Sequence, residues 1–235
     1  MRLNQFIAHA GVCSRRKADQ LILAHKIKVN GKEMSDLAYQ VLPDDIVSYQ
    51  GKRLMVQMKK YYLLNKPDNT ITTAHDPQGR RTVLDLMREV ASERIYPVGR
   101  LDRNTTGLLL LTNNGELAHQ LAHPSYQIQK TYEVTLKEKV APSDIKKLKR
   151  GVKLADGMAK VDTVTPLDHA GKKLSLTLHS GKNRVIRRLF EALNYQLLAL
   201  DRVGYAGLTQ VGIDVGAWRS LSQKEVASLH RLLQK

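Results

Sequence analysis

Length, composition and charge already exclude several classes of protein. The chain has 235 residues, 42% of them hydrophobic, which is enough for one large or two modest domains with real cores and too apolar for disorder throughout. Its single cysteine, Cys13, excludes internal disulfides and zinc sites that need two or more cysteines, and it fits a reducing compartment. The 38 Lys and Arg residues outnumber the 22 Asp and Glu residues, giving a formal net charge of +16. Because this excess is spread over the whole chain, it indicates one long electropositive surface for a polyanion such as nucleic acid.

No segment has the pattern of a membrane helix or a secretion signal. The aliphatic runs at residues 108–111 and 197–200 are far shorter than the roughly 20 residues that span a bilayer. Asn4 and Gln5 interrupt any apolar secretory segment at the N-terminus. We therefore expect a soluble cytoplasmic protein with no membrane partner.

The first sixty residues predict a small α-then-β module. Apolar residues at helical spacing indicate a helix over residues 3–10, which Gly11 ends. Ser14 is a suitable N-cap for a second helix. Extended segments follow at residues 27–29, 33–34 and 46–49, and Asn30-Gly31 predicts a hairpin turn between the first two.

The first turn of the second helix holds three cations, Arg15, Arg16 and Lys17. The helix dipole disfavours cations at this end by about 0.3–1 kcal/mol each when they are poorly screened. A phosphate bound at the helix N-terminus would reverse this penalty. An exposed, screened basic turn explains the same residues equally well, so both interpretations stay open.

A polar linker at residues 57–60 separates this module from a larger domain. Strand candidates occur at residues 61–64, 108–112, 130–136 and 174–179. Helices are predicted at residues 83–90, 116–122, 143–150, 183–194 and 223–233. This succession favours a mixed α+β domain with a substantial sheet.

Several familiar kinds of active site are missing from the sequence. It contains neither a G-x-x-x-x-G-K-[ST] loop nor a G-x-G-x-x-G loop, and no G-x-S-x-G nucleophile elbow. His119 and His123 have the spacing of a zinc-binding helix, but the catalytic Glu and a third ligand are lacking. We expect no cofactor, and an acidic nucleophile or base is what remains.

The best candidate carboxylate is Asp102, which stands between Arg100 and Arg103 in a loop before a buried strand. An arginine partner would keep this carboxylate ionised and nucleophilic in a partly buried loop. Alternatively, Asp102 organises its own turn through hydrogen bonds to the backbone.

A second cluster of charged residues begins at residue 180. The apolar stripe at Ile186, Leu189 and Phe190 predicts a helix that places Arg184 and Arg188 one turn apart on another face. Cations again load the start of a helix, so an anion is expected nearby: RNA phosphate, the carboxylate of Asp102, or both. A basic surface without a ligand is the alternative.

Both parts of the chain resemble known families. Residues 1–16, together with V-N-G-K at 29–32, resemble the small RNA-binding module of ribosomal protein S-four. The motifs G-R-L-D-x-x-T-x-G-L at 99–108, K-T-Y-x-V at 130–134 and G-K-N-R-x-I-R-R at 181–188 resemble the RsuA-type family of ribosomal RNA pseudouridine synthases, and this resemblance covers essentially the whole chain. The sequence departs from the family pattern at Val185, where Gln is expected, and at Ala206, where Gly is usual.

The RsuA-type resemblance implies a reaction and its catalytic residues. Asp102 would be the nucleophile that helps detach uracil from its ribose, so that the base can be rejoined through carbon as pseudouridine. Tyr132 would lie against the uracil and is a candidate for the proton-abstracting group, and Arg187 would pair with Asp102. The reaction needs neither a metal nor a redox cofactor.

The resemblance also implies the architecture, the RNA-binding residues and the partner. The fold would be α+β, with a small α/β RNA-binding module at residues 1–58 and a mainly antiparallel catalytic domain at residues 61–235. We expect a monomer that acts on ribosomal RNA; the same chemistry on transfer RNA, or a non-catalytic RNA-binding or ribosome-assembly factor, are the alternatives. The predicted substrate-binding residues are Arg100, Leu101, Arg103, Thr105, Lys182, Arg184, Arg188 and Arg202, together with Arg15, Arg16 and Lys17 of the module.

Overall fold

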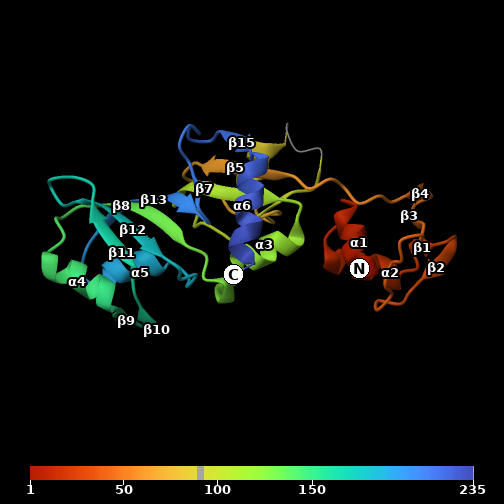
Figure 1. Ribbon diagram of the computed structural model, residues 1–235, viewed down its shortest axis with the longest axis horizontal. Helices are drawn as coiled ribbons and strands as arrows, with labels where there is room; N and C mark the ends of the chain where they lie inside the picture. The colour runs from red at the N-terminus through yellow and green to blue at the C-terminus, as the bar shows by residue number, and fades with distance from the viewer. Residues whose placement is uncertain (89–92, 235) are drawn as a thin grey trace. The chain divides into compact units, whose positions relative to one another are not determined.

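The computed structural model describes residues 1–88 and 93–234, and the chain divides into two compact units (Figure 1). The first unit contains residues 1–60, and the second contains nearly all of the remainder. Within the described ranges, no helix has the length and apolar composition needed to cross a membrane.

The first unit packs two helices on a four-stranded antiparallel sheet of order β2-β1-β3-β4. Its elements are α1 (Leu3–His9), α2 (Arg15–Leu23), β1 (Ile27–Val29), β2 (Lys32–Met34), β3 (Val47–Tyr49) and β4 (Lys52–Arg53). The side chain of Ser14 caps α2 by accepting a hydrogen bond from the Lys17 N–H, as predicted. The predicted turn between β1 and β2 is also confirmed, with φ +52° at Asn30 and +81° at Gly31, both in the left-handed region that such hairpins need.

The second unit is built on one large sheet of order β11-β12-β8-β13-β7-β5-β15, with β14 added to β13 and β6 added to β7. Its strands are β5 (Tyr61–Lys66), β6 (Tyr96–Pro97), β7 (Thr106–Thr112), β8 (Lys130–Leu136), β11 (Thr163–Pro166), β12 (Lys173–Leu178), β13 (Leu197–Tyr205), β14 (Leu208–Thr209) and β15 (Trp218–Ser220). All neighbours pair antiparallel except β13 and β7, which are parallel. The expected mixed fold with a mainly antiparallel sheet is therefore confirmed.

Helices cover both halves of this sheet. They are α3 (Gly115–Ala122), α4 (Pro142–Arg150), α5 (Val185–Ala192) and α6 (Gln223–Leu233), with 3-10 turns η1 (Asp85–Met87) and η2 (Pro124–Tyr126) and a separate hairpin of β9 (Val152–Leu154) and β10 (Gly157–Ala159). One core packs α4 and α5 on β8 and β12, and a second core packs α3 and α6 on β5 and β7. The two helices of the second core lie side by side in Figure 1. Ser222 and Glu225 form a reciprocal capping box that starts α6 at its predicted first residue.

Three expectations about elements need correction. Residues 83–90 were expected to form a helix, but only the 3-10 turn η1 forms there, and residues 89–90 lie outside the described residues. Helix α5 begins at Val185, two residues later than predicted, because Arg184 has a left-handed backbone with φ +49°. The long central strand β13 was not predicted at all.

Candidate active site

A cavity of about 590 Å³ opens at the centre of the second unit. Its walls come from the loop that precedes β7, from β8 and β13, and from the segment that leads into α5. This volume is in the range of pockets that hold small organic ligands. Asp102 is one of the residues that line it.

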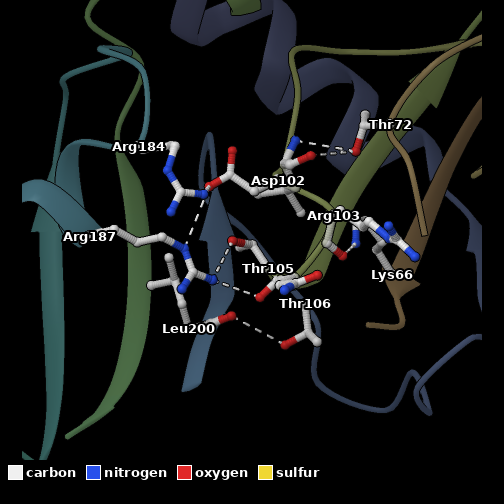
Figure 2. Close-up of polar contacts among 11 residues, drawn as sticks. Lys66, Thr72, Asp102, Arg103, Thr105, Thr106, Arg184, Arg187 and Leu200 are labelled. Carbon is white, nitrogen blue, oxygen red and sulfur yellow. Dashed lines mark hydrogen bonds and ion pairs between the residues drawn. The ribbon is translucent and has the colours of Figure 1, made fainter. Parts of the chain in front are cut away.

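Hydrogen bonds to the backbone hold the Asp102 loop on both sides (Figure 2). On one side, the Thr72 hydroxyl donates to the Leu101 carbonyl at 2.9 Å and lies 3.3 Å from the Leu101 N–H, which donates to it. On the other side, the Thr105 N–H donates to the Asp102 carbonyl at 3.1 Å. The loop is thus fixed without using the Asp102 carboxylate, which remains free for other contacts.

Two arginines from the α5 segment meet that carboxylate. Arg184 donates from Nη1 to Oδ2 at 3.3 Å, and Nε of Arg187 lies 3.6 Å from the same oxygen (Figure 2). The Asp102 side chain is still 32% exposed, so it stays reachable from the cavity. The expected contact between Arg187 and Asp102 is present. Arg184, which was predicted to bind substrate, is a second partner, and the Asp102 carboxylate was one of the anions expected near this segment.

Arg187 also fastens the loop itself. Its Nη2 donates to the Asn104 carbonyl at 2.7 Å and to the Thr105 hydroxyl at 3.3 Å. Its side chain is only 15% exposed. A planar guanidinium donates to these two acceptors while its charge faces the Asp102 carboxylate, in a fixed fork that an ammonium group lacks. Arg187 therefore fixes the position of Asp102 relative to α5.

The other cations of this segment have a different carboxylate partner. Arg188 makes a two-fold contact with Asp156 at the tip of the β9–β10 hairpin, at 2.9 and 3.1 Å. This contact holds the pKa of Asp156 below its usual range. Lys182 donates to the carbonyls of Asp156 and Met158 at 2.8 and 3.2 Å. The expectation that Arg184 and Arg188 share one face is wrong, because Arg184 precedes the helix and turns to Asp102.

Lys66 is a functional candidate that sequence reasoning missed. It ends β5 with a fully buried side chain, and its Nζ donates to the Pro67 carbonyl at 3.0 Å and to the Arg103 carbonyl at 3.1 Å. Lys66 and Arg103 are neighbours in Figure 2. Burial lowers its pKa to about 8, although Asp68 and Asp102 oppose that shift. The signal available in the sequence was a lysine at the end of an apolar strand, directly before a proline. The bond to the Arg103 carbonyl makes Lys66 a third support of the Asp102 loop.

Strands β8 and β13 contribute Tyr132, Lys130 and Arg202 to the lining of the cavity. Strand pairing sets Arg202 directly across from Tyr132. Only 2% of Arg202 is exposed; its Nε donates to the Leu108 carbonyl at 2.8 Å, and its guanidinium carbon lies 4.6 Å from the ring centre of Tyr205. Lys130 was not among the predicted site residues, and its place two residues before Tyr132 on β8 was the signal for it.

The predicted site residues divide into three groups. The cavity is lined by Arg100, Leu101, Asp102, Thr105, Tyr132, Lys182, Arg184 and Arg202. Arg103, Arg187 and Arg188 do not line it: Arg103 donates to the Asn69 side chain at 2.6 Å, and the other two make the contacts given above. Arg15, Arg16 and Lys17 lie exposed on the first turn of α2 in the other unit, where both interpretations of that basic turn remain open.

The paired histidines of α3 form no metal site in the described part of the chain, where no three His, Cys, Asp or Glu side chains gather around one point. The rings of His119 and His123 instead stack on each other with centres 5.3 Å apart. His123 also stacks edge-on with Tyr126 and lines the rim of the cavity. This contact explains the helical spacing of the pair.

Comparison with known proteins gives a family match for each of the two units. The family model described as RNA pseudouridylate synthase matches residues 60–192, and the S4 domain model matches residues 1–47. The chain is 42% identical over 98% of its length to "Ribosomal large subunit pseudouridine synthase B" of Bacillus subtilis (strain 168), covering 96% of that protein. It is 40% identical over 98% of its length to a protein of Aquifex aeolicus (strain VF5) named "Uncharacterized RNA pseudouridine synthase", covering 94% of that protein.

A solved structure supports the same assignment. The crystal structure of a pseudouridylate synthase superposes with a TM-score of 0.70 at 25% identity, covering 97% of this chain and 99% of that one. The fold, the cavity with its carboxylate and the sequence similarity agree along the whole chain. This protein belongs to the RNA pseudouridylate synthase family.

Proposed function

We propose that this protein converts a uridine of ribosomal RNA to pseudouridine, with Asp102 as the nucleophile. The observation that carries this proposal is the Asp102 carboxylate, which is open to the cavity while two guanidinium groups hold it. The substrate follows from the relatives named as ribosomal large subunit pseudouridine synthases and from the net charge of +16.

The reaction is an isomerisation, so the site must hold an intermediate rather than supply atoms. The bond between N1 of uracil and C1′ of ribose breaks, the base turns, and a bond between C5 and C1′ forms; the proton lost from C5 is balanced by one gained at N1. An Asp102 carboxylate that adds to the sugar or to the base assists the first step and is released in the last. The hydrogen bonds to Leu101, Asn104 and Thr105 keep the carboxylate in place throughout.

Residues around Asp102 are proposed to handle the base and the RNA backbone. Tyr132 would lie against the uracil ring and accept the proton from C5. Arg100, exposed at the rim, would contact the nucleotide as it leaves the RNA fold, and Arg103 beside it would help to extrude it. Extrusion of a base costs a few kcal/mol and is easiest in loops, which favours a target in an RNA loop.

The two parts of the chain would divide the work. We assign RNA affinity and orientation to residues 1–58 and chemistry to residues 61–235. Arg15, Arg16 and Lys17 stand exposed at the N-terminal end of α2, where a phosphate would also meet free backbone N–H groups. Such contacts position the RNA without reading its sequence.

Tritium release from ribosomal RNA that carries 5-tritiated uridine tests the proposal. The wild type is compared, in EDTA and without added cofactor, with Asp102→Asn and with Asp214→Asn, which changes an exposed aspartate outside the cavity. Wild type and Asp214→Asn should release tritium, whereas Asp102→Asn should bind the RNA with nearly unchanged affinity and release none. Turnover by Asp102→Asn would contradict the nucleophile assignment. Tritium release from transfer RNA alone would change the proposed substrate to transfer RNA. If neither RNA releases tritium, a non-catalytic RNA-binding factor becomes the better explanation.

A further inference from the structure

Two cations that line the cavity have no carboxylate partner: Arg202 on β13 and Lys130 on β8. In the described ranges, no Asp or Glu oxygen lies within 4.0 Å of either group. Arg202 is almost completely buried, and its Nη2 has no hydrogen-bond partner. Lys130 donates to two carbonyls, those of Ile128 at 2.8 Å and His179 at 3.3 Å, which leaves one of its three N–H groups for a ligand.

This arrangement is costly for the free protein. A buried charge without a partner loses its hydration and gains no ion pair in return. The two cations also act on each other, since burial and then the charge of Arg202 lower the pKa of Lys130 to about 8. Buried polar groups left unpaired in a cavity wall are expected where a ligand completes them. The ligand that would complete this pair carries negative charge.

The position of the pair favours the base of the substrate over its phosphates. Arg202 faces Tyr132 across β13 and β8, and Lys130 shares the Tyr132 face of β8. Tyr132 is the residue proposed to lie against the uracil. A phosphodiester, attached to a ribose on each side, is unsuited to a guanidinium that is only 2% exposed, whereas Arg100 and Arg184 stand exposed at the rim for that purpose.

Uracil becomes an anion during the proposed reaction. When the bond between N1 and C1′ breaks, both electrons stay with the base, and the charge spreads over the ring and its two carbonyl oxygens. The charge disappears again when C5 uses a pair of electrons to bond to C1′ and the C5 proton is exchanged for one at N1. A fixed positive charge near the ring is therefore useful between these two steps.

We propose that Arg202 and Lys130 form a cationic floor of the cavity that binds the uracil ring and stabilises its negative charge while it is detached from the ribose. This inference rests on the proposed function, because it assigns a role in the same reaction. It adds two groups of the cavity lining, Lys130 through its remaining N–H and the buried Arg202 through its charge, and neither acts on Asp102 or on the RNA backbone.

A binding experiment tests the floor without any RNA. The probes are 5-nitrouracil, whose nitro group makes the ring an anion at neutral pH, and uracil, which is neutral. Ligand-observed NMR should give tighter binding of 5-nitrouracil by about tenfold or more in the wild type, which an interaction worth about 1.4 kcal/mol would produce. Lys130→Met should lose this preference and Lys130→Arg should keep it. The control Lys137→Met removes an exposed lysine just past β8 and should behave as the wild type.

Steady-state kinetics then distinguishes a contact with the uracil base from a contact with the RNA phosphates. With the RNA that the wild type converts, Lys130→Met should lower kcat by about 100-fold and change KM little, as for the loss of a group that stabilises transition-state charge. Equal binding of the two probes by the wild type, or a preference kept by Lys130→Met, would overturn the inference. A raised KM with unchanged kcat would also overturn it, in favour of phosphate contact. If the wild type prefers 5-nitrouracil to uracil but converts no RNA, the proposed function is refuted while the anion-binding role of Arg202 and Lys130 is supported.

Arg202 needs a second variant, because its Nε bond to Leu108 and its contact with Tyr205 also serve the fold. Arg202→Gln should lose the preference for 5-nitrouracil if it still unfolds cooperatively. If it does not fold, the comparison of Lys130→Met with Lys130→Arg decides the matter alone.

Discussion

Replacing Gly107 by alanine should destabilise the second unit strongly. Gly107 lies in β7 opposite Arg202 of the parallel strand β13, and its φ of +99° is one that residues with a side chain rarely adopt. A Cβ at this position would collide with the Arg202 carbonyl oxygen and would lie 2.5 Å from Oδ1 of Asp201 and 2.7 Å from the Arg202 nitrogen. Because two of these three atoms are backbone, relief requires β13 to move away from β7.

The size of the effect follows from two costs. An unfavourable φ costs about 1–3 kcal/mol, and overpacking that shifts the backbone costs about 1–3 kcal/mol more. The sum is about 2–6 kcal/mol of unfolding free energy. For a unit of this size, 1 kcal/mol corresponds to roughly 2–4 °C in Tm, so the transition of this unit should fall by at least about 4 °C.

Differential scanning calorimetry measures this shift. The matched control is Gly181→Ala, because Gly181 has an ordinary φ and no atom within 4 Å of an added Cβ, so its Tm should stay within about 2 °C of the wild type. If Gly107→Ala has the same Tm as Gly181→Ala, β13 moves away from the added Cβ without loss of stability, and the reasoning is refuted. The variant should also turn over slowly at a temperature where it is folded, because the collision displaces Arg202 in the cavity wall.

Three further changes test other parts of the structure. Arg187→Lys keeps a charge but not the fork that holds the Asp102 loop, so single-turnover rates should fall about 100-fold with RNA affinity unchanged; an unchanged rate would remove Arg187 from the positioning of Asp102. Arg15→Ala combined with Arg16→Ala should flatten the slope of log K against log salt by about 1.4–1.8, and an unaltered slope in filter binding would place no phosphate at these arginines. Lys66 has a pKa of about 8 in the folded protein against 10.5 in the unfolded chain, so the unfolded state binds more protons between these two pH values. The free energy of unfolding should therefore rise with pH in this range, by up to about 1.4 kcal/mol per pH unit. Urea unfolding at pH 8 and pH 10 should show this rise in the wild type beyond that in Lys66→Met, and parallel changes in both would refute a depressed pKa.

The elements that local signals define were predictable from the sequence. Strand β8 and helix α6 have their predicted bounds, Lys130–Leu136 and Gln223–Leu233. In α2, one side chain, Ser14, closes the helix start through a bond to a residue three positions away. Such signals lie within a few residues of the element that they define, so a single sequence is enough to find them.

Strand β13 shows why other elements were missed. It places Asp201 and Arg202 in the middle of a sheet, where charged residues are unusual. Each has a partner on β7, about 95 residues earlier in the chain: Thr106 donates to Asp201, and the Leu108 carbonyl accepts from Nε of Arg202, whose Nη2 has no hydrogen-bond partner. Nothing near β13 in the sequence announces these partners, and only the order of the strands brings them together.

The active site was also predictable only in part: residues within the motifs were found, and residues that act from distant segments were not. The motifs supplied Asp102 and Arg187, since the family resemblance rests on them. Thr72, Lys66 and Asp156 were not found, because each contacts a segment at least 26 residues away in the sequence. The left-handed backbone of Arg184, which turns this side chain to Asp102, has no helical pattern to reveal it.

The hydrogen bonds of the Asp102 loop explain the spacing of the motif G-R-L-D-x-x-T-x-G. The two variable positions after the aspartate are Arg103 and Asn104, whose contacts with Lys66 and Arg187 are made by their carbonyl oxygens. Any side chain leaves those oxygens in place, so the pattern leaves both positions open. Thr105 is specified because its hydroxyl accepts from Arg187.

The same reasoning covers the end of the motif. Gly107 is specified because β13 passes too close for a Cβ. The motif is therefore the part of the loop whose side chains, or lack of one, are required, while its supports come from β5 and α5. Because Lys66, Thr72 and Arg187 hold the loop largely through its backbone carbonyls, we expect it to stay fixed when RNA binds. If Asp102 is the nucleophile and the basic first turn of α2 binds RNA, as proposed, the two can be changed independently, so the variants above are expected to separate turnover from affinity.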